Sequence, residues 1–191
     1  MKRLLIPALF AMTATAPACA GDTDPGHLKE SRATAQEFMQ KLGGVLKEQL
    51  ATSGAESAIG VCKQVAPALA AEYSKDGRSV KRVSLKPRNQ SQGTPDAWEA
   101  KVLHDFDQAA GKGQAAAELE QHLIVEESGG RWFRYMKAIP TQPLCLQCHG
   151  RPEQIPEGVQ ALLAREYPND QATGYSAGLV RGAVSIRRKL D

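Results

Sequence analysis

The segment "PLCLQCHG", residues 143–150, places two thiols and an imidazole within five positions. Cys145 and Cys148 are three residues apart, and His149 follows directly. Two thiols at this spacing can each add to one vinyl group of a haem, and the adjacent imidazole can then bind the iron. The C-x-x-C-H pattern therefore predicts one covalently attached c-type haem, with His149 as an axial ligand.

Three other interpretations of the paired thiols remain open, and each fits the sequence less well. A structural zinc site needs a further ligand pair, whereas Cys62 with His104 or His122 is a scattered set. A thioredoxin-like redox pair is expected at a strand-to-helix junction, but this pair lies in a proline-flanked loop. A plain disulfide within the pair would leave His149 without a role.

The first 20 residues have the layout of a secretory signal peptide. Lys2 and Arg3 precede a short apolar run, and small residues lead to an expected cut after Ala20. A lipoprotein anchored through Cys19 is the weaker interpretation, because the leucine usual three positions upstream is missing. We therefore expect a periplasmic or otherwise exported protein. Its mature part, residues 21–191, should be a single c-type haem-binding domain without a membrane-spanning segment. Export favours the haem interpretation, since this attachment occurs outside the cytoplasm.

The charge of the chain argues against a nucleic-acid partner. The formal net charge is +3 at pH 7, and signal cleavage would remove Lys2 and Arg3, two positive charges and no acids, leaving +1. Nucleic-acid binding usually needs clustered lysine and arginine on one face. The clusters Lys81-Arg82 and 187–189 are short, and we interpret them as solvated surface.

Cys62 is the one cysteine of the expected mature chain that lies outside the C-x-x-C-H segment. Two thioether bonds would consume the other two, which leaves Cys62 without an intramolecular disulfide partner. It is then either a buried, inert side chain or a ligand of the iron. The competing ligands are three histidines and two methionines: His27, His104, His122, Met39 and Met136.

Two helices are predicted before any strand. Apolar residues at helical spacing predict a long helix over residues 27–50, weakened at Gly43-Gly44, and a second helix over residues 55–73. The second helix places Cys62 on its apolar face. Pro67 cannot donate a backbone hydrogen bond, so we expect a kink or break just after Cys62.

Strands and shorter helices follow these two. The pattern predicts a strand near residues 79–85, a helix capped by Thr94 with Pro95 as its first residue, and a hairpin turning at residues 128–130. Prolines around the C-x-x-C-H segment should keep that segment out of regular secondary structure. A short helix over residues 158–166 and a last strand are predicted after it. Helices followed by an antiparallel sheet predict an α+β domain.

Three segments carry a resemblance to a known family. "AIGVCKQVAPALA", "VKRVSLKPRN" with "TPDAWE", and "CLQCHG" are similar to exported single-haem domains of unknown function, with a PAS-like fold and a c-type haem ligated by His and Cys. The resemblance implies a PAS-like antiparallel sheet with long N-terminal helices and a C-terminal haem-binding loop. It implies that Cys145 and Cys148 attach the haem, and that His149 and Cys62 bind the iron. Two residues of the shared "SLKPRN" turn are candidate propionate partners: Lys86 and Arg88.

A His/Cys-ligated haem should have a low reduction potential, because a thiolate donates charge and favours ferric iron. Together with a helix that Pro67 would let move, this favours a redox or small-gas sensor. The alternative is a low-potential periplasmic electron-transfer cytochrome. Two protein ligands leave no open iron position, so we expect no enzymatic activity. No output segment is recognisable, so we expect an unidentified redox or signalling protein as partner.

Overall fold

The computed structural model of the chain describes residues 24–190. The predicted signal peptide, residues 1–20, and the alternative anchor Cys19 lie outside the described residues and stay predictions. Within residues 24–190, no helix has both the length and the apolar character that a membrane crossing needs.

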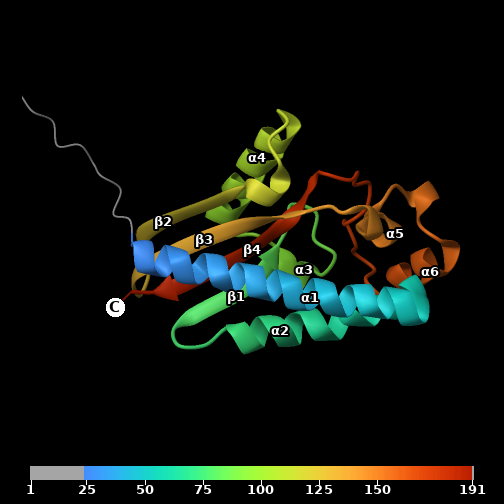
Figure 1. Cartoon of the computed structure of the whole chain (residues 1–191), viewed down its shortest axis with the longest axis horizontal. Coiled ribbons are helices and arrows are strands. Elements are labelled where there is room, and N and C mark those ends of the chain that lie inside the picture. Colours follow the sequence, from blue (N-terminus) through green and yellow to red (C-terminus); the bar gives the residue numbers. More distant parts are fainter. Residues whose placement is uncertain (1–23, 191) are drawn as a thin grey trace, which may run out of the picture.

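An antiparallel sheet of four strands separates two helical layers (Figure 1). The strands lie in the order β1-β4-β3-β2. Their bounds are β1 (Arg78–Val83), β2 (Glu120–Glu127), β3 (Gly130–Pro140) and β4 (Val180–Lys189). The helices are α1 (Pro25–Gly60), α2 (Ala66–Tyr73), α3 (Gln90–Gly93), α4 (Ala97–Gly111), α5 (Leu146–His149) and α6 (Glu157–Glu166). This arrangement confirms the predicted α+β class.

Both faces of the sheet are buried. Side chains alternate along a strand, so neighbouring residues face opposite layers. Ala183 of β4 packs with α4, whereas Val184 packs with Phe38 of α1 and Leu69 of α2. A third apolar cluster joins Ile59, near the end of α1, to α6. The C-terminal end of α1 therefore lies beside α6 (Figure 1).

Helix α1 is longer than predicted and breaks at a different glycine. It runs through Gly43-Gly44 without interruption and has its non-helical residue at Gly54, with φ 79° and ψ 178°. Each helical glycine costs only about 1 kcal/mol relative to alanine, and the packing of a helix face outweighs this. The expected weak point at Gly43-Gly44 is therefore wrong. The positive φ at Gly54 is readily accessible only to glycine.

The helix that carries Cys62 widens instead of breaking. Residues Val61–Val65 form a π-helical turn, η1, and the backbone N–H of Ala66 donates to the carbonyl of Val61. Pro67 has no N–H to donate to the carbonyl of Lys63, and its ring would clash with that carbonyl in a regular α-helix. The π-helical turn accommodates the proline, so the predicted disturbance is present in this form. The helix predicted over residues 55–73 is otherwise confirmed.

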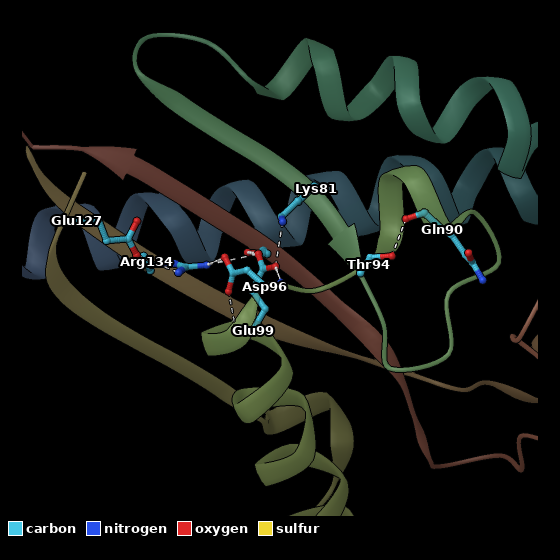
Figure 2. Close-up of polar contacts among 8 residues, drawn as sticks. Lys81, Gln90, Thr94, Asp96, Glu99, Glu127 and Arg134 are labelled. Atoms are coloured by element: carbon cyan, nitrogen blue, oxygen red, sulfur yellow. Dashed lines mark hydrogen bonds and ion pairs between the residues drawn. The ribbon is translucent and has the colours of Figure 1, made fainter. Parts of the chain in front are cut away.

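Helix α4 begins later than predicted, because Asp96 and not Thr94 is its N-cap. The Asp96 carboxylate accepts a hydrogen bond from the backbone N–H of Glu99 (2.9 Å), and the Glu99 carboxylate accepts one from the N–H of Asp96 (2.8 Å). This reciprocal capping box satisfies two backbone donors at once. Thr94 is instead the C-cap of α3, and its hydroxyl donates to the carbonyl of Gln90, the first residue of that helix (Figure 2).

Glu99 is also the centre of a buried polar network between α4 and the sheet (Figure 2). Its carboxylate accepts hydrogen bonds from Lys81 of β1 (2.9 Å) and Ser185 of β4 (2.6 Å), and Arg134 of β3 lies 3.6 Å away. Arg134 also pairs with Asp96. The network holds α4 against three strands, so Lys81 is not the free surface cation that its sequence context suggested.

We expect Glu99→Gln to lower the free energy of unfolding by about 3 kcal/mol, because the buried Arg134 and the partly exposed Lys81 then lose a counter-charge. Glu99 is 1% exposed. Urea denaturation would measure the change. The control is Lys101→Met, which removes an exposed pair with Asp105 on the same helix and should change little. Equal effects of the two variants would contradict a stabilising role for this network.

Candidate functional site

The residues singled out by the sequence meet at two adjoining cavities near the ends of β3 and β4. The larger cavity has a volume of about 310 Å³ and the smaller one about 190 Å³. Both are lined by Cys62 and His149, and also by Ile139 and three arginines. Cys145 and Cys148 line the smaller cavity. Residues far apart in the sequence therefore converge on one place.

His149 is held by its backbone and by its ring. The backbone carbonyl accepts a hydrogen bond from the N–H of Tyr175 (2.9 Å), and the ring Nδ1 lies 2.7 Å from the carbonyl oxygen of Ala172. The Nε of Arg181 also lies 3.3 Å from Nδ1. A carbonyl can only accept and a guanidinium can only donate, so Nδ1 cannot serve both. The shorter contact assigns the proton to Nδ1, which leaves the lone pair on Nε2.

The electrostatic surroundings keep this imidazole neutral. Burial holds the pKa of His149 well below its ordinary value, and the positive charges of Arg181 and Arg88 lower it further. A metal binds the neutral form of imidazole, and a hydrogen bond from the other ring nitrogen to a carbonyl is the usual support for such a ligand. The neutral ring of His149 could therefore offer Nε2 to a metal.

Cys145 and Cys148 lie on consecutive helical turns, not in an irregular loop as predicted. A 3₁₀ turn, η3 (Pro143–Cys145), leads directly into α5. Prolines start such turns readily, because the first N–H of a helix has no intrahelical partner. Residues three apart lie on the same helical side, so both thiols can face one ligand. Burial raises the pKa of the Cys148 thiol.

Cys62 reaches the site from the π-helical turn η1. It is half-buried and lines both cavities, and its negative form would raise the pKa of the Cys148 thiol. Cys62, Cys145 and Cys148 are all free thiols in the structure. π-Helical turns are rare and occur frequently at functional sites. The position of Cys62 is compatible with a ligand role and with the predicted inward orientation.

The competing ligands lie in different places. Met39 lines the smaller cavity, whereas Met136 is fully buried in the core against α4. The His122 ring stacks on Phe133, with 5.9 Å between centroids, and Nδ1 of His27 lies 2.5 Å from the Asp24 carboxylate. His104 is exposed on α4 and lines neither cavity. Met39 is thus the one of these five side chains that lies at the site.

The two predicted propionate partners are separated by the structure. Arg88 lines both cavities; it donates to the Cys148 carbonyl (2.5 Å) and to the Asp170 carboxylate (2.9 Å). Lys86 lines neither; its Nζ donates to the Thr173 carbonyl and lies over the Tyr175 ring. Propionate binding by either residue stays a prediction.

Sequence reasoning missed two arginines at the site. Arg82 was interpreted as solvated surface, but it lines both cavities from β1. Arg181 was not singled out; it is buried, lines both cavities and donates to the Ser84 hydroxyl (2.9 Å). The alternation of β1 could have indicated Arg82, because it lies on the same strand face as Val80, a residue of the α1-side core.

Gly182 lies where β4 leaves regular pairing beside the larger cavity. The register shifts between Ile139 and Pro140 of the neighbouring strand, and a Cβ at position 182 would lie 2.4 Å from the carbonyl oxygen of Val83. No side chain can occupy that space unless β1 and β4 move apart.

We therefore expect Gly182→Ala to lower the free energy of unfolding by about 1–3 kcal/mol, the usual effect of overpacking. The control is Gly44→Ala, at a helical glycine with nothing within 4 Å of the added Cβ, which should stabilise the protein by up to about 1 kcal/mol. Thermal unfolding followed by circular dichroism would measure both changes. A neutral Gly182→Ala variant would show that the two strands are not constrained there.

Together, the fold and the site define an α+β, PAS-like domain with histidine and cysteine side chains gathered at two cavities beside its sheet. The chain belongs to the Tll0287-like family, whose model matches residues 26–188. The family resemblance seen in the sequence is thereby confirmed.

A solved structure shows the same fold. It is described as the crystal structure of the cyanobacterial heme-protein Tll0287, and the two chains are 24% identical with a TM-score of 0.61. The similarity covers 88% of this chain and 98% of that chain. It confirms the PAS-like prediction. A search of the curated proteins found no match.

Proposed function

We propose that this chain is an exported redox or small-gas sensor that binds one haem c. Cys145 and Cys148 would attach the haem, and His149 and Cys62 would be its axial ligands. The observation that carries this proposal is the convergence of Cys62 with the C-x-x-C-H segment at the same pair of cavities. The similar fold of a protein described as a heme-protein supports it.

The residues at the site fit a haem in three respects. The larger cavity alone reaches the range of about 300–1,000 Å³ that is typical of small-molecule sites. Apolar side chains of α1, such as Leu42 and Leu46, form part of the lining of the smaller cavity, beside the two thiols. Within residues 24–190, no group of three or more His, Cys, Asp or Glu side chains could hold a metal ion, whereas a structural zinc site uses four such ligands.

A bound haem would supply a one-electron couple and an iron that can bind small gases. The protein would constrain one axial ligand, His149, more tightly than the other, Cys62. His149 is fixed through Nδ1 and through its backbone carbonyl. Cys62 lies on a π-helical turn, where the backbone hydrogen bonds depart from the α-helical pattern. We therefore infer that Cys62 is the ligand that can be exchanged.

This inequality favours sensing over electron transfer, because an electron carrier works best when both of its ligands stay in place. We propose no enzymatic role, and the signal would pass to a separate redox or signalling protein. Movement of the η1 turn would reach α2 directly, since α2 continues from it without a loop. The surface of α2 is then the first candidate for transmitting a change at the site.

Stopped-flow mixing of the reduced holoprotein with CO would test the sensor proposal. We expect CO to bind, at a rate limited by departure of Cys62 and therefore independent of CO at high concentration. Cys62→Ala should remove that limit, so that the rate rises with CO throughout. A wild-type protein that binds no CO and exchanges electrons rapidly with itself would instead be an electron-transfer cytochrome.

A further inference from the structure

Three guanidinium groups share the wall between the two cavities. Arg82, Arg88 and Arg181 line both cavities, and no aspartate or glutamate lines either one. The Asp170 carboxylate pairs with Arg88, at 2.9 Å. Lys81 also lines the larger cavity, but it pairs with Glu99. Of the three arginines, only Arg88 has a carboxylate partner, so the positive charges of Arg82 and Arg181 are not paired with a carboxylate of the described residues.

Two of these arginines are already bound by protein groups. Arg88 donates to Asp170 and to the Cys148 carbonyl, and Arg181 donates to the Ser84 hydroxyl. Arg82 differs, because its guanidinium group has no hydrogen bond or ion pair with any residue of the described range 24–190, although its backbone pairs with β4. It is half-buried in the wall of both cavities.

The surroundings of Arg181 show that these charges repel one another. Burial lowers the pKa of Arg181 to about 10, and the positive charges of Arg82 and Arg88 act in the same direction. Buried charges of one sign destabilise a protein unless a counter-charge or hydrogen-bond partner is present. A ligand that carries two negative charges would remove this imbalance.

We propose that Arg82, Arg88 and Arg181 form a binding site for a pair of carboxylates, and that Arg82 binds one of them directly. If the proposed function holds, the two carboxylates are the propionates of the haem. Arginine suits this role because its planar N–H groups bind a carboxylate in a bidentate manner. The cluster would fix the orientation of the porphyrin by its acidic edge, while Cys145 and Cys148 fix its vinyl edge.

The site differs from the one that the sequence suggested, because the Lys86 side chain takes no part in it and only the Lys86 carbonyl contacts Arg181. Lys86 lies four residues after Arg82 and carries the same charge, but it is exposed and bound to Thr173. A pair of variants, Arg82→Leu and Lys86→Leu, therefore removes one positive charge from the same segment, inside and outside the site.

Resonance Raman spectroscopy of the holoproteins would detect the propionates directly, through their bending band. We expect Arg82→Leu to shift this band and to lower the reduction potential, because a positive charge near the iron is lost, and Arg82→Lys to restore both in part. Lys86→Leu should leave the band in place. A band that responds to Lys86→Leu and not to Arg82→Leu would overturn the assignment, while the haem itself would remain established.

Succinate, added as a free dicarboxylate, separates the remaining outcomes. Calorimetry should detect no binding to the wild-type holoprotein, because the propionates already occupy the site. Succinate binding that Arg82→Leu abolishes would assign the cluster to a separate ligand and overturn the propionate assignment. If the purified chain carries no haem, the proposed function fails; succinate binding that depends on Arg82 would then still support the carboxylate site, and absence of binding would refute it.

Discussion

A chain with the double substitution Cys145→Ala and Cys148→Ala is expected to lose all covalently bound haem. The thiols are three residues apart on consecutive helical turns and line one cavity, so each can bond to one vinyl group. The measurement is a haem-stained denaturing gel of the full chain, expressed together with a c-type haem attachment system. The wild-type polypeptide band should stain for haem, and the band of the double variant should not.

The control for this experiment is Cys62→Ala, which removes a thiol from the same pair of cavities. It should stain as strongly as the wild type, because Cys62 is expected to bind the iron and not the vinyl groups. Staining of the double variant would contradict covalent attachment through the C-x-x-C-H segment. Loss of stain in Cys62→Ala alone would instead indicate that Cys62 is needed for stable holoprotein.

Cys62→Ala itself is expected to have the second large effect. Loss of a thiolate ligand should raise the reduction potential by on the order of 100 mV or more, since axial ligands set haem potentials over a range of about 0.8 V. The ferric optical and EPR spectra should change with it. A spectroelectrochemical titration of the wild type and the variant would measure both quantities.

Met39→Leu is the matched control, because Met39 also lines the smaller cavity and could offer a thioether sulfur. It preserves approximate volume and should leave the potential and the spectra close to those of the wild type. If Met39→Leu changed the spectra and Cys62→Ala did not, the axial sulfur would belong to Met39. The sensor proposal would then lose its exchangeable ligand.

Local patterns in the sequence predicted the parts of the site that depend on neighbouring residues. The spacing of Cys145, Cys148 and His149 is a property of one segment, and the apolar face that carries Cys62 follows from helical periodicity. The hairpin turn at residues 128–130 and the last strand are confirmed for the same reason. Such features need no knowledge of how distant elements pack.

Features that depend on packing between elements were missed or misplaced. Asp96 caps α4 because Glu99 can then meet both Asp96 and the sheet, a choice that the local sequence "TPD" leaves open. Arg82 and Lys81 are adjacent cations on opposite faces of β1. Arg82 lines both cavities, whereas Lys81 lines only the larger one and pairs with Glu99. Only the order of strands in the sheet brings Arg181 beside them.

The unequal hold on His149 and Cys62, the two proposed axial ligands, also arises from tertiary structure. Ala172, whose carbonyl fixes the His149 ring, lies in a segment for which the sequence predicted no element. The π-helical turn at Cys62 follows from Pro67, but a proline can equally break or kink a helix. Sequence reasoning therefore predicted the disturbance near Cys62 and could not predict that the helix would continue through it.

The ferric EPR spectrum of the purified wild-type holoprotein tests most directly whether Cys62 and His149 bind the same iron. A single low-spin species with the narrow spread of g values that a thiolate opposite an imidazole produces is the expected result, and Cys62→Ala should abolish it. A wild-type spectrum typical of two histidines, of histidine and methionine, or of high-spin iron with water would contradict the proposed ligand pair.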